Sequence, residues 1–188
     1  APRSMPTSLP SAPCAVCRSP LEELGHRQGY VYAACRACGG VQLTPMPSAE
    51  ELARLYREAY HNAGHSDLSP EQNLAHRRNI FEFVARRARA LHPPDDPRLV
   101  VELGAGWGGF GVVARELGLP YLGLEPSEAM SAHAQASGLH VLRGGLDALE
   151  SESGVQGRIR AFVALAVYEH LPEQLDALRR MSRLLPPD

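Results

Sequence analysis

Four cysteines stand in two pairs that have the spacing of metal-binding knuckles. Cys14 and Cys17 form one C-x2-C pair, and Cys35 and Cys38 form the second. Four thiolates satisfy the tetrahedral coordination that Zn²⁺ prefers, whereas the competing interpretation, a redox dithiol, needs only one such pair. We therefore predict a structural zinc site with all ligand positions filled, in a ribbon over residues 14–45 whose segment GYVYAA forms a hairpin strand.

A second pattern is a run of glycines that follows an apolar segment and a carboxylate, VVELGAGWGGFG at residues 100–111. Gly104, Gly106 and Gly109 form a G-x-G-x-x-G pattern, and Glu125 follows Gly104 by about twenty residues, the spacing of a dinucleotide-type site. Glycines let the backbone approach a ligand, and a carboxylate at that distance can bind ribose hydroxyls. The pattern predicts a site for a nucleoside-containing ligand.

Glu102, two residues before Gly104, separates two candidate ligands. A dinucleotide would place its pyrophosphate at the start of the following helix, where a carboxylate would repel it. S-adenosylmethionine carries an ammonium and a sulfonium there, has a ribose for Glu125, and has no phosphate. The residues thus favour S-adenosylmethionine over a nicotinamide cofactor, which is the weaker alternative.

The elements that must position these residues alternate between strand and helix patterns. Apolar runs at residues 99–103, 120–126, 139–144 and 161–167 predict strands, and residues 108–118, 127–138 and 171–185 predict helices. This order predicts an α/β fold with a parallel sheet and right-handed crossovers. The domains we expect are a disordered lead-in, the zinc ribbon, a helical connector that opens with a Ser48–Glu51 capping box, and a ligand-binding domain: residues 1–13, 14–45, 46–97 and 98–188.

Composition excludes several classes of protein. A formal net charge of −2 provides no broad basic surface for nucleic acid, and the longest apolar runs are too short to span a membrane. The sequence also begins without the basic and apolar regions of a secretion signal. Together with cysteines spaced for metal binding, this predicts a reducing, cytoplasmic location.

These motifs together resemble the class I S-adenosylmethionine-dependent methyltransferases. ELGAGWG resembles their motif I, LGLEPS the acidic end of their second strand, and LAVYEHLPEQLDALRRMSRLLPPD their fourth strand and its helix. The paired cysteines followed by VQLTPMPSAEELARLYREAY are similar to the N-terminal zinc module of a bacterial subgroup that includes sugar and natural-product enzymes. The resemblance covers residues 14–188 and implies a Rossmann-like fold that transfers a methyl group to a small molecule or sugar.

The resemblance also implies ligand contacts. Gly104, Ala105 and Gly106 would lie under the methionine part of S-adenosylmethionine, with Glu102 near its ammonium group.

Further contacts would come from the ends of the other strands. Glu125 would bind the ribose and Pro126 would lie beside the adenine, as would Gly145 and Leu146. Many family members have aspartate at the position of Gly145, so one hydrogen bond to the adenine is in question. Ala164 would line the pocket from the fourth strand.

Methyl transfer needs alignment of the acceptor and, for hydroxyl or amine acceptors, removal of a proton. His170 is the first candidate for that base, because histidine accepts protons near neutral pH and this one follows the fourth strand. Glu169 is the second candidate. Some relatives bind a divalent metal through E-x-x-E-H here, but the first position is Ala166, so we expect no such metal site.

Family members usually continue beyond LLPPD with a fifth strand and an antiparallel pair. The four strands alone would have the order 3-2-1-4, with residues 161–167 as an apolar edge. Three explanations are open: the sequence is a piece of a longer protein, another copy or a partner chain supplies the remainder, or the protein is naturally short. The alternative to an enzyme is therefore a non-catalytic cofactor-binding or scaffolding module that a partner chain completes.

Overall fold

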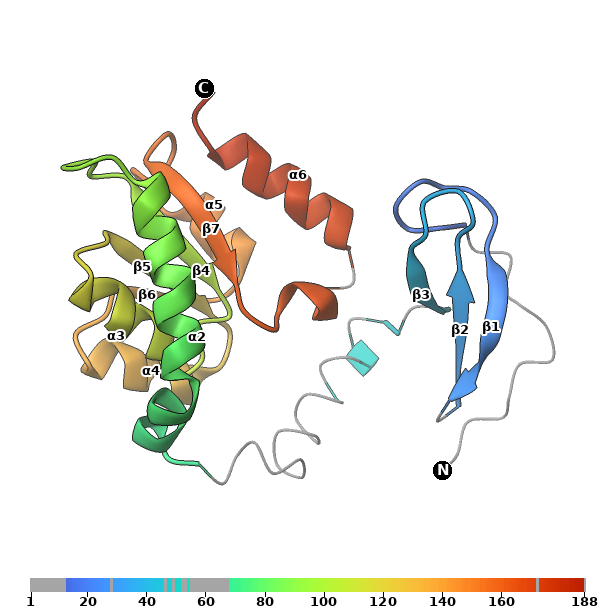
Figure 1. The fold of residues 1–188 in the computed structure, drawn as a ribbon, viewed down its shortest axis with the longest axis horizontal. Coiled ribbons are helices and arrows are strands. Elements are labelled where there is room, and N and C mark those ends of the chain that lie inside the picture. The colour runs from blue at the N-terminus through green and yellow to red at the C-terminus, as the bar shows by residue number, and fades with distance from the viewer. Residues whose placement is uncertain are drawn as a thin grey trace. The chain divides into compact units, whose positions relative to one another are not determined.

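The computed structural model describes residues 13–27, 29–45, 47–48, 50–51, 54, 68–171 and 173–187. The chain divides into two compact units, Ala1–Gly64 and His65–Asp188 (Figure 1). Most of the expected lead-in, residues 1–12, lies outside the described residues, and the expected domain boundaries stay a prediction. In the described part of the chain, we find no helix with the length and apolar character needed to cross a bilayer.

The first unit is a three-stranded antiparallel sheet with a small core. Strands β1 (Glu22–Arg27), β2 (Tyr30–Ala34) and β3 (Val41–Thr44) pair in the order β1-β2-β3. The first cysteine pair precedes β1, and the second lies in the turn between β2 and β3. The hairpin expected at GYVYAA is thus formed by β2 against β1. Few side chains of this unit are fully buried, so a metal is a natural means of stabilising it.

The second unit is built on a parallel four-stranded sheet. Its strands are β4 (Leu99–Leu103), β5 (Tyr121–Glu125), β6 (Val141–Arg143) and β7 (Ile159–Ala164), in the order β6-β5-β4-β7. This is the predicted order 3-2-1-4, so the Rossmann-like fold is confirmed. β4 and β5 are the central pair and are almost wholly buried, as expected for strands covered by helices on both faces.

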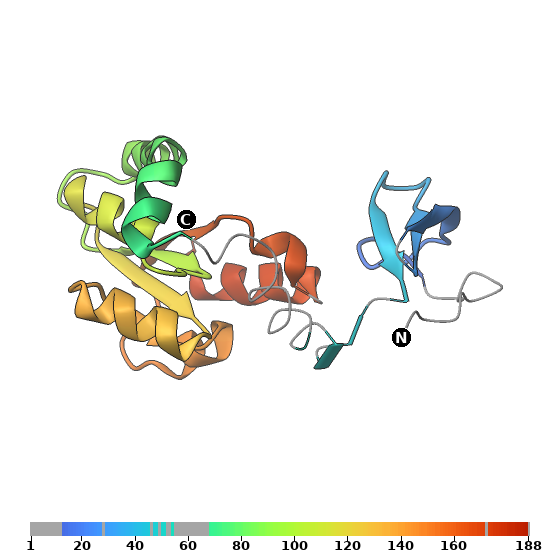
Figure 2. The same ribbon diagram turned by 90° about the horizontal axis from the view of Figure 1, so that it is seen from below.

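Five helices cover the two faces of this sheet (Figure 2): α2 (Pro70–Leu91), α3 (Gly109–Glu116), α4 (Glu128–Ala136), α5 (Leu146–Ser151) and α6 (Gln174–Leu184). Helices α2, α3 and α4 pack on one face, where Phe81 and Phe110 meet Val100 of β4. Helices α5 and α6 pack on the other face around Leu122 and Leu124. Successive side chains of β5 therefore point alternately toward the two groups of helices.

The elements differ from the predicted ones in three places. In the expected helical connector, the apolar spacing of NIFEFVARRARAL (residues 79–91) predicts a helix. Helix α2 begins nine residues earlier, at Pro70, because Ser69 and Gln72 form a capping box. Helix α5 lies in a stretch without a predicted element. Strand β7 ends at Ala164, earlier than expected, because Ala166 has a left-handed φ of +57° that breaks the extended backbone.

Another local prediction is confirmed. The Ser48 backbone N–H donates to Glu51 Oε2 at 2.9 Å, and the Glu51 N–H donates to Ser48 Oγ at 3.2 Å. These are the reciprocal bonds of the expected capping box.

Candidate functional site

The glycine loop joins β4 to α3 in a backbone conformation that requires glycine. Gly104, Gly106 and Gly108 have φ values of +68°, +55° and +85°, in the left-handed region. A Cβ atom on Gly104 would also lie 2.4 Å from Cγ2 of Val167, which follows β7. The loop therefore depends on its glycines for this conformation, and Val167 packs closely against the first of them.

Glu125 is held at this loop by two backbone hydrogen bonds. Its side chain is buried at the end of β5, where Oε2 accepts from the Gly106 N–H at 2.7 Å and Oε1 accepts from the Ser127 N–H at 2.8 Å. A carboxylate has about four acceptor positions, so each oxygen can still accept a hydroxyl. Because Glu125 occupies the Gly106 N–H, that donor is not available to a phosphate.

Glu102 lies beside Glu125 in the same buried region. It is only 3% exposed, and its Oε2 accepts a hydrogen bond from the Tyr121 hydroxyl at 2.6 Å. The pKa of Glu102 is raised to about 8, and burial is the main cause. Smaller effects are the Tyr121 hydrogen bond, which lowers this pKa, the charge of Glu125, which raises it, and the charge of Arg77, which lowers it. The site thus concentrates acidic groups where a cationic ligand would be stabilised.

Tyr121 is a site residue that the sequence analysis missed. Burial raises its pKa far above the usual range, and the neighbouring Glu102 raises it further, so it stays a hydrogen-bond donor. Glu102 is paired with Gly123 in the β4–β5 register, and the absence of a side chain on Gly123 leaves room for the Tyr121 hydroxyl. The period of two along β5 places Tyr121, Gly123 and Glu125 on one face and could have identified this contact.

The other predicted ligand residues also lie at the carboxyl ends of the strands. Ala105 is buried in the loop, Pro126 is exposed directly after β5, and Gly145 is exposed as the N-cap of α5. Leu146 is buried in the core cluster of the α5–α6 face, so its backbone, rather than its side chain, borders the edge. Ala164 pairs with the last residue of β4. Open α/β sheets bind ligands along this edge.

The two candidate bases lie further from the strand than expected. Glu169 and His170 belong to a short 3₁₀ helix, η1 (Tyr168–His170), and both side chains are about half exposed. His170 Nε2 lies 4.0 Å from Glu169 Oε1. Val167 is the residue of this segment that contacts the loop, at Gly104. The structure therefore places both candidates at the correct end of the sheet and leaves their catalytic roles a prediction.

The four cysteine sulfurs in the first unit form one cluster. All four Sγ atoms lie within 4.8 Å of one another, with Cys14 to Cys38 at 3.6 Å and Cys17 to Cys35 at 3.4 Å. Four thiolates at about 2.3 Å from a tetrahedral zinc would be roughly 3.8 Å apart, and a disulfide would require about 2.05 Å. The residues thus fit a zinc ion.

Local hydrogen bonds favour the thiolate form of the first pair. The Ser19 hydroxyl, followed by its backbone N–H, lowers the pKa of Cys17 to about 6. For Cys14 the backbone N–H of Cys17 is the main group that lowers the pKa. Thiolates are the form that binds metal.

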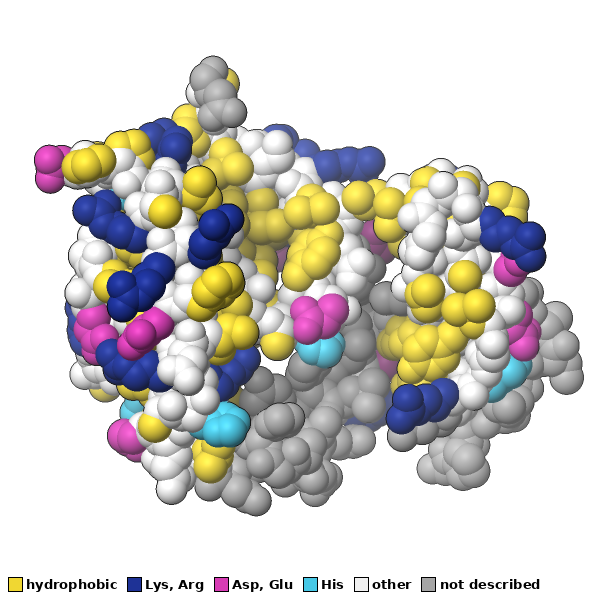
Figure 3. Space-filling view, in the orientation of Figure 1, with side chains coloured by type: hydrophobic (Ala, Val, Ile, Leu, Met, Phe, Trp, Pro, Cys, Tyr) yellow, Lys and Arg dark blue, Asp and Glu magenta, His cyan; other side chains and the backbone are white. Residues whose placement is uncertain are grey.

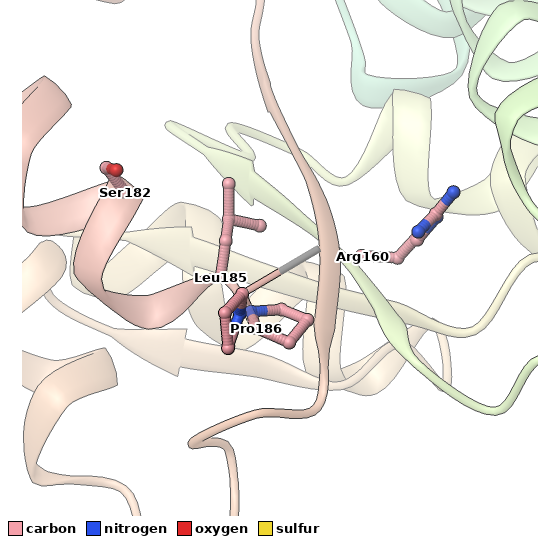
Figure 4. Close-up of a pocket in the computed structure, with 5 residues that line it drawn as sticks. Arg160, Ser182, Leu185 and Pro186 are labelled. Carbon is pink, nitrogen blue, oxygen red and sulfur yellow. The ribbon is translucent and has the colours of Figure 1, made fainter.

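A pocket of about 430 Å³ lies at the opposite end of the sheet from the glycine loop. It is lined by Arg160 near the start of β7 and by residues at and after the end of α6, which are Ser182, Leu185, Pro186 and Pro187 (Figure 4). Because it borders the amino end of β7, it is not part of the ligand site at the carboxyl ends of the strands.

Comparison with known proteins agrees with this geometry. The sequence profile of the family described as "Methyltransferase domain" matches residues 73–188. A structure of a SAM-dependent methyltransferase from Archaeoglobus fulgidus is 22% identical with a TM-score of 0.47, over 57% of this chain and 48% of that one. The CcbJ methyltransferase from Streptomyces caelestis is 27% identical with a TM-score of 0.45, over 57% and 48%.

A third structure, the cyclopropane synthase MmaA2 from Mycobacterium tuberculosis, is 19% identical with a TM-score of 0.49, over 66% of this chain and 43% of that one. No curated protein sequence is significantly similar to this chain. The chain spans about half the length of the solved structures that it matches. The family profile covers more than half of the chain and coincides with the Rossmann-like unit. The chain therefore belongs to the methyltransferase domain family.

Proposed function

We propose that this chain binds S-adenosylmethionine at the glycine loop and transfers its methyl group to a small-molecule acceptor. The observation that carries the proposal is the pair of buried carboxylates, Glu102 and Glu125, at the loop. Burial and the charge of Glu125 disfavour the charged form of Glu102; a ligand with a cationic end would stabilise that form, whereas a pyrophosphate would not. The loop N–H that a phosphate would need is already bonded to Glu125.

Each part of the ligand has a proposed partner in this arrangement. Glu125 would accept hydrogen bonds from the ribose hydroxyls, and Glu102 would stabilise the ammonium. Pro126 and the backbone at Gly145 and Leu146 would border the adenine.

The chemistry requires little from the protein beyond alignment and removal of a proton. S-adenosylmethionine supplies a methyl group on a positively charged sulfur. An acceptor hydroxyl or amine that gains this methyl group must lose its proton. His170 would take that proton, and Glu169 beside it would stabilise the imidazolium that forms. Sugars and natural products of similar size are the acceptors that we propose.

We assign the cysteine cluster a structural role. Four thiolates fill the coordination of zinc and leave no position for a substrate or a water. The metal would hold the two cysteine turns together and thereby fix the β1–β2–β3 sheet. The protein would act in a reducing compartment, the cytoplasm, where thiolates stay free to bind zinc.

Substitution of Glu125 tests the ligand site. Glu125→Gln should weaken the binding of S-adenosylhomocysteine by about 10- to 100-fold, the range for a hydrogen bond to a charged group. Glu128→Gln is the matched control, because Glu128 lies exposed three residues away and pairs with Arg143. Isothermal titration calorimetry would give both constants. Equal affinities of folded Glu125→Gln and wild-type protein for S-adenosylhomocysteine would contradict the assignment. A wild-type protein that binds the cofactor but transfers its methyl group to no acceptor would favour the non-catalytic module.

A further inference from the structure

The four cysteines of the first unit differ in their access to solvent. Cys14 and Cys35 are each only 1% exposed, whereas Cys17 and Cys38 are exposed. The Cys14 sulfur also accepts a hydrogen bond from the Val16 backbone N–H at 3.4 Å. Each C-x2-C pair therefore buries its first cysteine and presents its second to solvent.

The surroundings of Cys38 leave its sulfur open on one side. A Cβ atom on Gly40 would lie 3.4 Å from Cys38 Sγ, so the absence of a side chain at Gly40 uncovers that side of the sulfur. The turn between β2 and β3 and the segment before β1 form the upper end of this unit, where uncharged surface predominates (Figure 3). A small neutral oxidant therefore meets Cys17 and Cys38 before the buried pair.

The sulfurs are close neighbours across the two turns. Cys17 Sγ lies 3.4 Å from Cys35 Sγ, and Cys38 Sγ lies 3.6 Å from Cys14 Sγ. Each of these contacts joins an exposed cysteine of one turn to a buried cysteine of the other turn. A sulfur that is oxidised at the surface thus has a specific buried thiolate beside it.

Backbone hydrogen bonds shape both turns without the help of a metal. The Cys14 N–H donates to the Ser19 carbonyl at 2.9 Å, and the Cys35 N–H donates across the second turn at 2.8 Å. The Ala15 N–H donates to Gln42 Oε1 at 2.8 Å, which connects the first turn to β3. These bonds favour the same sulfur neighbours at the moment when a metal leaves.

We propose that the cluster is a peroxide-reactive site in which Cys17 and Cys38 are attacked and Cys35 and Cys14 resolve them as disulfides. The inference goes beyond the proposed function and rests on the structural zinc assigned above. Cysteine sulfurs that bind zinc are thiolates, the form that reacts with a hydroperoxide. The Cys17 thiolate takes one oxygen of hydrogen peroxide, becomes a sulfenic acid and releases hydroxide. The Cys35 thiolate then attacks the oxidised sulfur, which forms the disulfide and releases a second hydroxide.

The second pair reacts in the same way with a second peroxide, Cys38 as the attacked sulfur and Cys14 as the resolving one. Each peroxide accepts two electrons from one pair of sulfurs, and sulfurs in disulfides no longer hold the zinc ion. Both disulfides join the two turns, as the metal does, whereas a disulfide within either C-x2-C pair would not. Oxidation would thus convert a ribbon held by zinc into a ribbon held by disulfides, and thiol reductants would reverse the change.

Treatment of the zinc-loaded chain with hydrogen peroxide tests this assignment. A chromogenic chelator should report release of the zinc, and peptide mapping without reductant should find the disulfides Cys17–Cys35 and Cys14–Cys38. The oxidised, zinc-free ribbon should resist protease, in contrast to the reduced chain after chelation. Dithiothreitol followed by zinc should restore the original state.

Variants separate the two pairs and test the importance of access. Peroxide should form only the Cys17–Cys35 disulfide in Cys38→Ser, and only the Cys14–Cys38 disulfide in Cys17→Ser. Gly40→Val, which removes no ligand, should slow the oxidation of Cys38 relative to that of Cys17 in the same molecule. Val41→Leu, which enlarges an exposed side chain at the next position, is the control and should react like wild type.

Several results would overturn the inference, and the mapping of wild type decides should a variant not fold. These are disulfides within either C-x2-C pair, a disulfide between the two exposed cysteines, and zinc that stays bound while free glutathione in the same solution is oxidised. A reduced chain that carries no zinc would overturn the zinc assignment and this inference together. Binding of S-adenosylhomocysteine reports separately on the proposed function.

Discussion

Glu102 combines burial, a hydrogen bond from Tyr121 and a nearby second carboxylate, and this combination has a consequence in solution. Tyr121 and Glu125 face it from β5 and Arg77 from α2. With a pKa of about 8, Glu102 is largely protonated at pH 7 in the unligated protein. Because this pKa is above the usual glutamate value of 4.5, the unligated protein should lose stability as the pH rises from about 4.5 to about 8.

The affinity for S-adenosylhomocysteine should therefore increase from pH 6 to pH 8. The ligand's ammonium favours the carboxylate form, so binding releases a proton below the pKa, and the affinity gains up to about tenfold per pH unit. Calorimetric titrations at pH 6, 7 and 8, in two buffers with different heats of ionisation, measure both effects. Glu102→Gln should abolish the dependence. A wild-type affinity that is constant across this range would contradict the protonation state that we assign.

At the scale of elements, the glycine loop and the turn after β7 depend on each other. In Gly104→Ala the new Cβ would meet Val167 at 2.4 Å, in addition to the left-handed φ. In Gly106→Ala the φ is also left-handed but no atom lies within 4 Å of the new Cβ. We expect a loss of about 1–2 kcal/mol for Gly106→Ala and a clearly larger loss for Gly104→Ala. Denaturant unfolding measures both, and equal losses would show that Val167 does not constrain the loop.

The elements also show how far sequence patterns lead. The four strands could be predicted from apolar runs between glycines, because strands buried on both faces of a parallel sheet are almost wholly apolar. Their order could be predicted from the family resemblance. The start of α2 was missed because its first turns carry polar residues, although Ser69 and Gln72 formed a recognisable capping signal. The positive φ of Ala166, which ends β7, has no signal in a residue type that rarely adopts it.

The candidate site also contains residues that could be predicted from the sequence and residues that could not. Glu102 and Glu125 could be identified because each stands at a strand end at a known distance from the glycines. The charge of Arg77 near Glu102 could not be predicted, since it depends on how α2 packs across the sheet, and no local sequence pattern indicates that packing. The positions of candidate bases on short turns, such as His170, are the least predictable, because no strand or helix pattern fixes the geometry of a turn.

At the scale of the whole molecule, each compact unit has its own core. The ribbon should therefore depend on zinc, and the methyltransferase unit should not. Zinc binding contributes on the order of 10 kcal/mol in small zinc modules, more than so small a core provides. We expect Cys35→Ser, or a strong chelator, to make residues 13–45 sensitive to protease while the affinity for S-adenosylhomocysteine stays unchanged.

Metal analysis and limited proteolysis measure this, and restored protection after adding zinc to chelated wild type is the control. A chelated protein that keeps its protease resistance would exclude a structural metal. Joint loss of ribbon and ligand binding would show that the two units are energetically coupled.

The most direct test of the central claim is a calorimetric titration of the zinc-loaded chain with S-adenosylhomocysteine, with NADH as the comparison. The buried carboxylates at the glycine loop and the bonded Gly106 N–H predict micromolar binding of S-adenosylhomocysteine and no binding of NADH. Binding of NADH alone would contradict the account, since a phosphate would then occupy the place that we assign to a cation. Binding of neither ligand by a folded chain would contradict the claim that this chain holds a complete cofactor site.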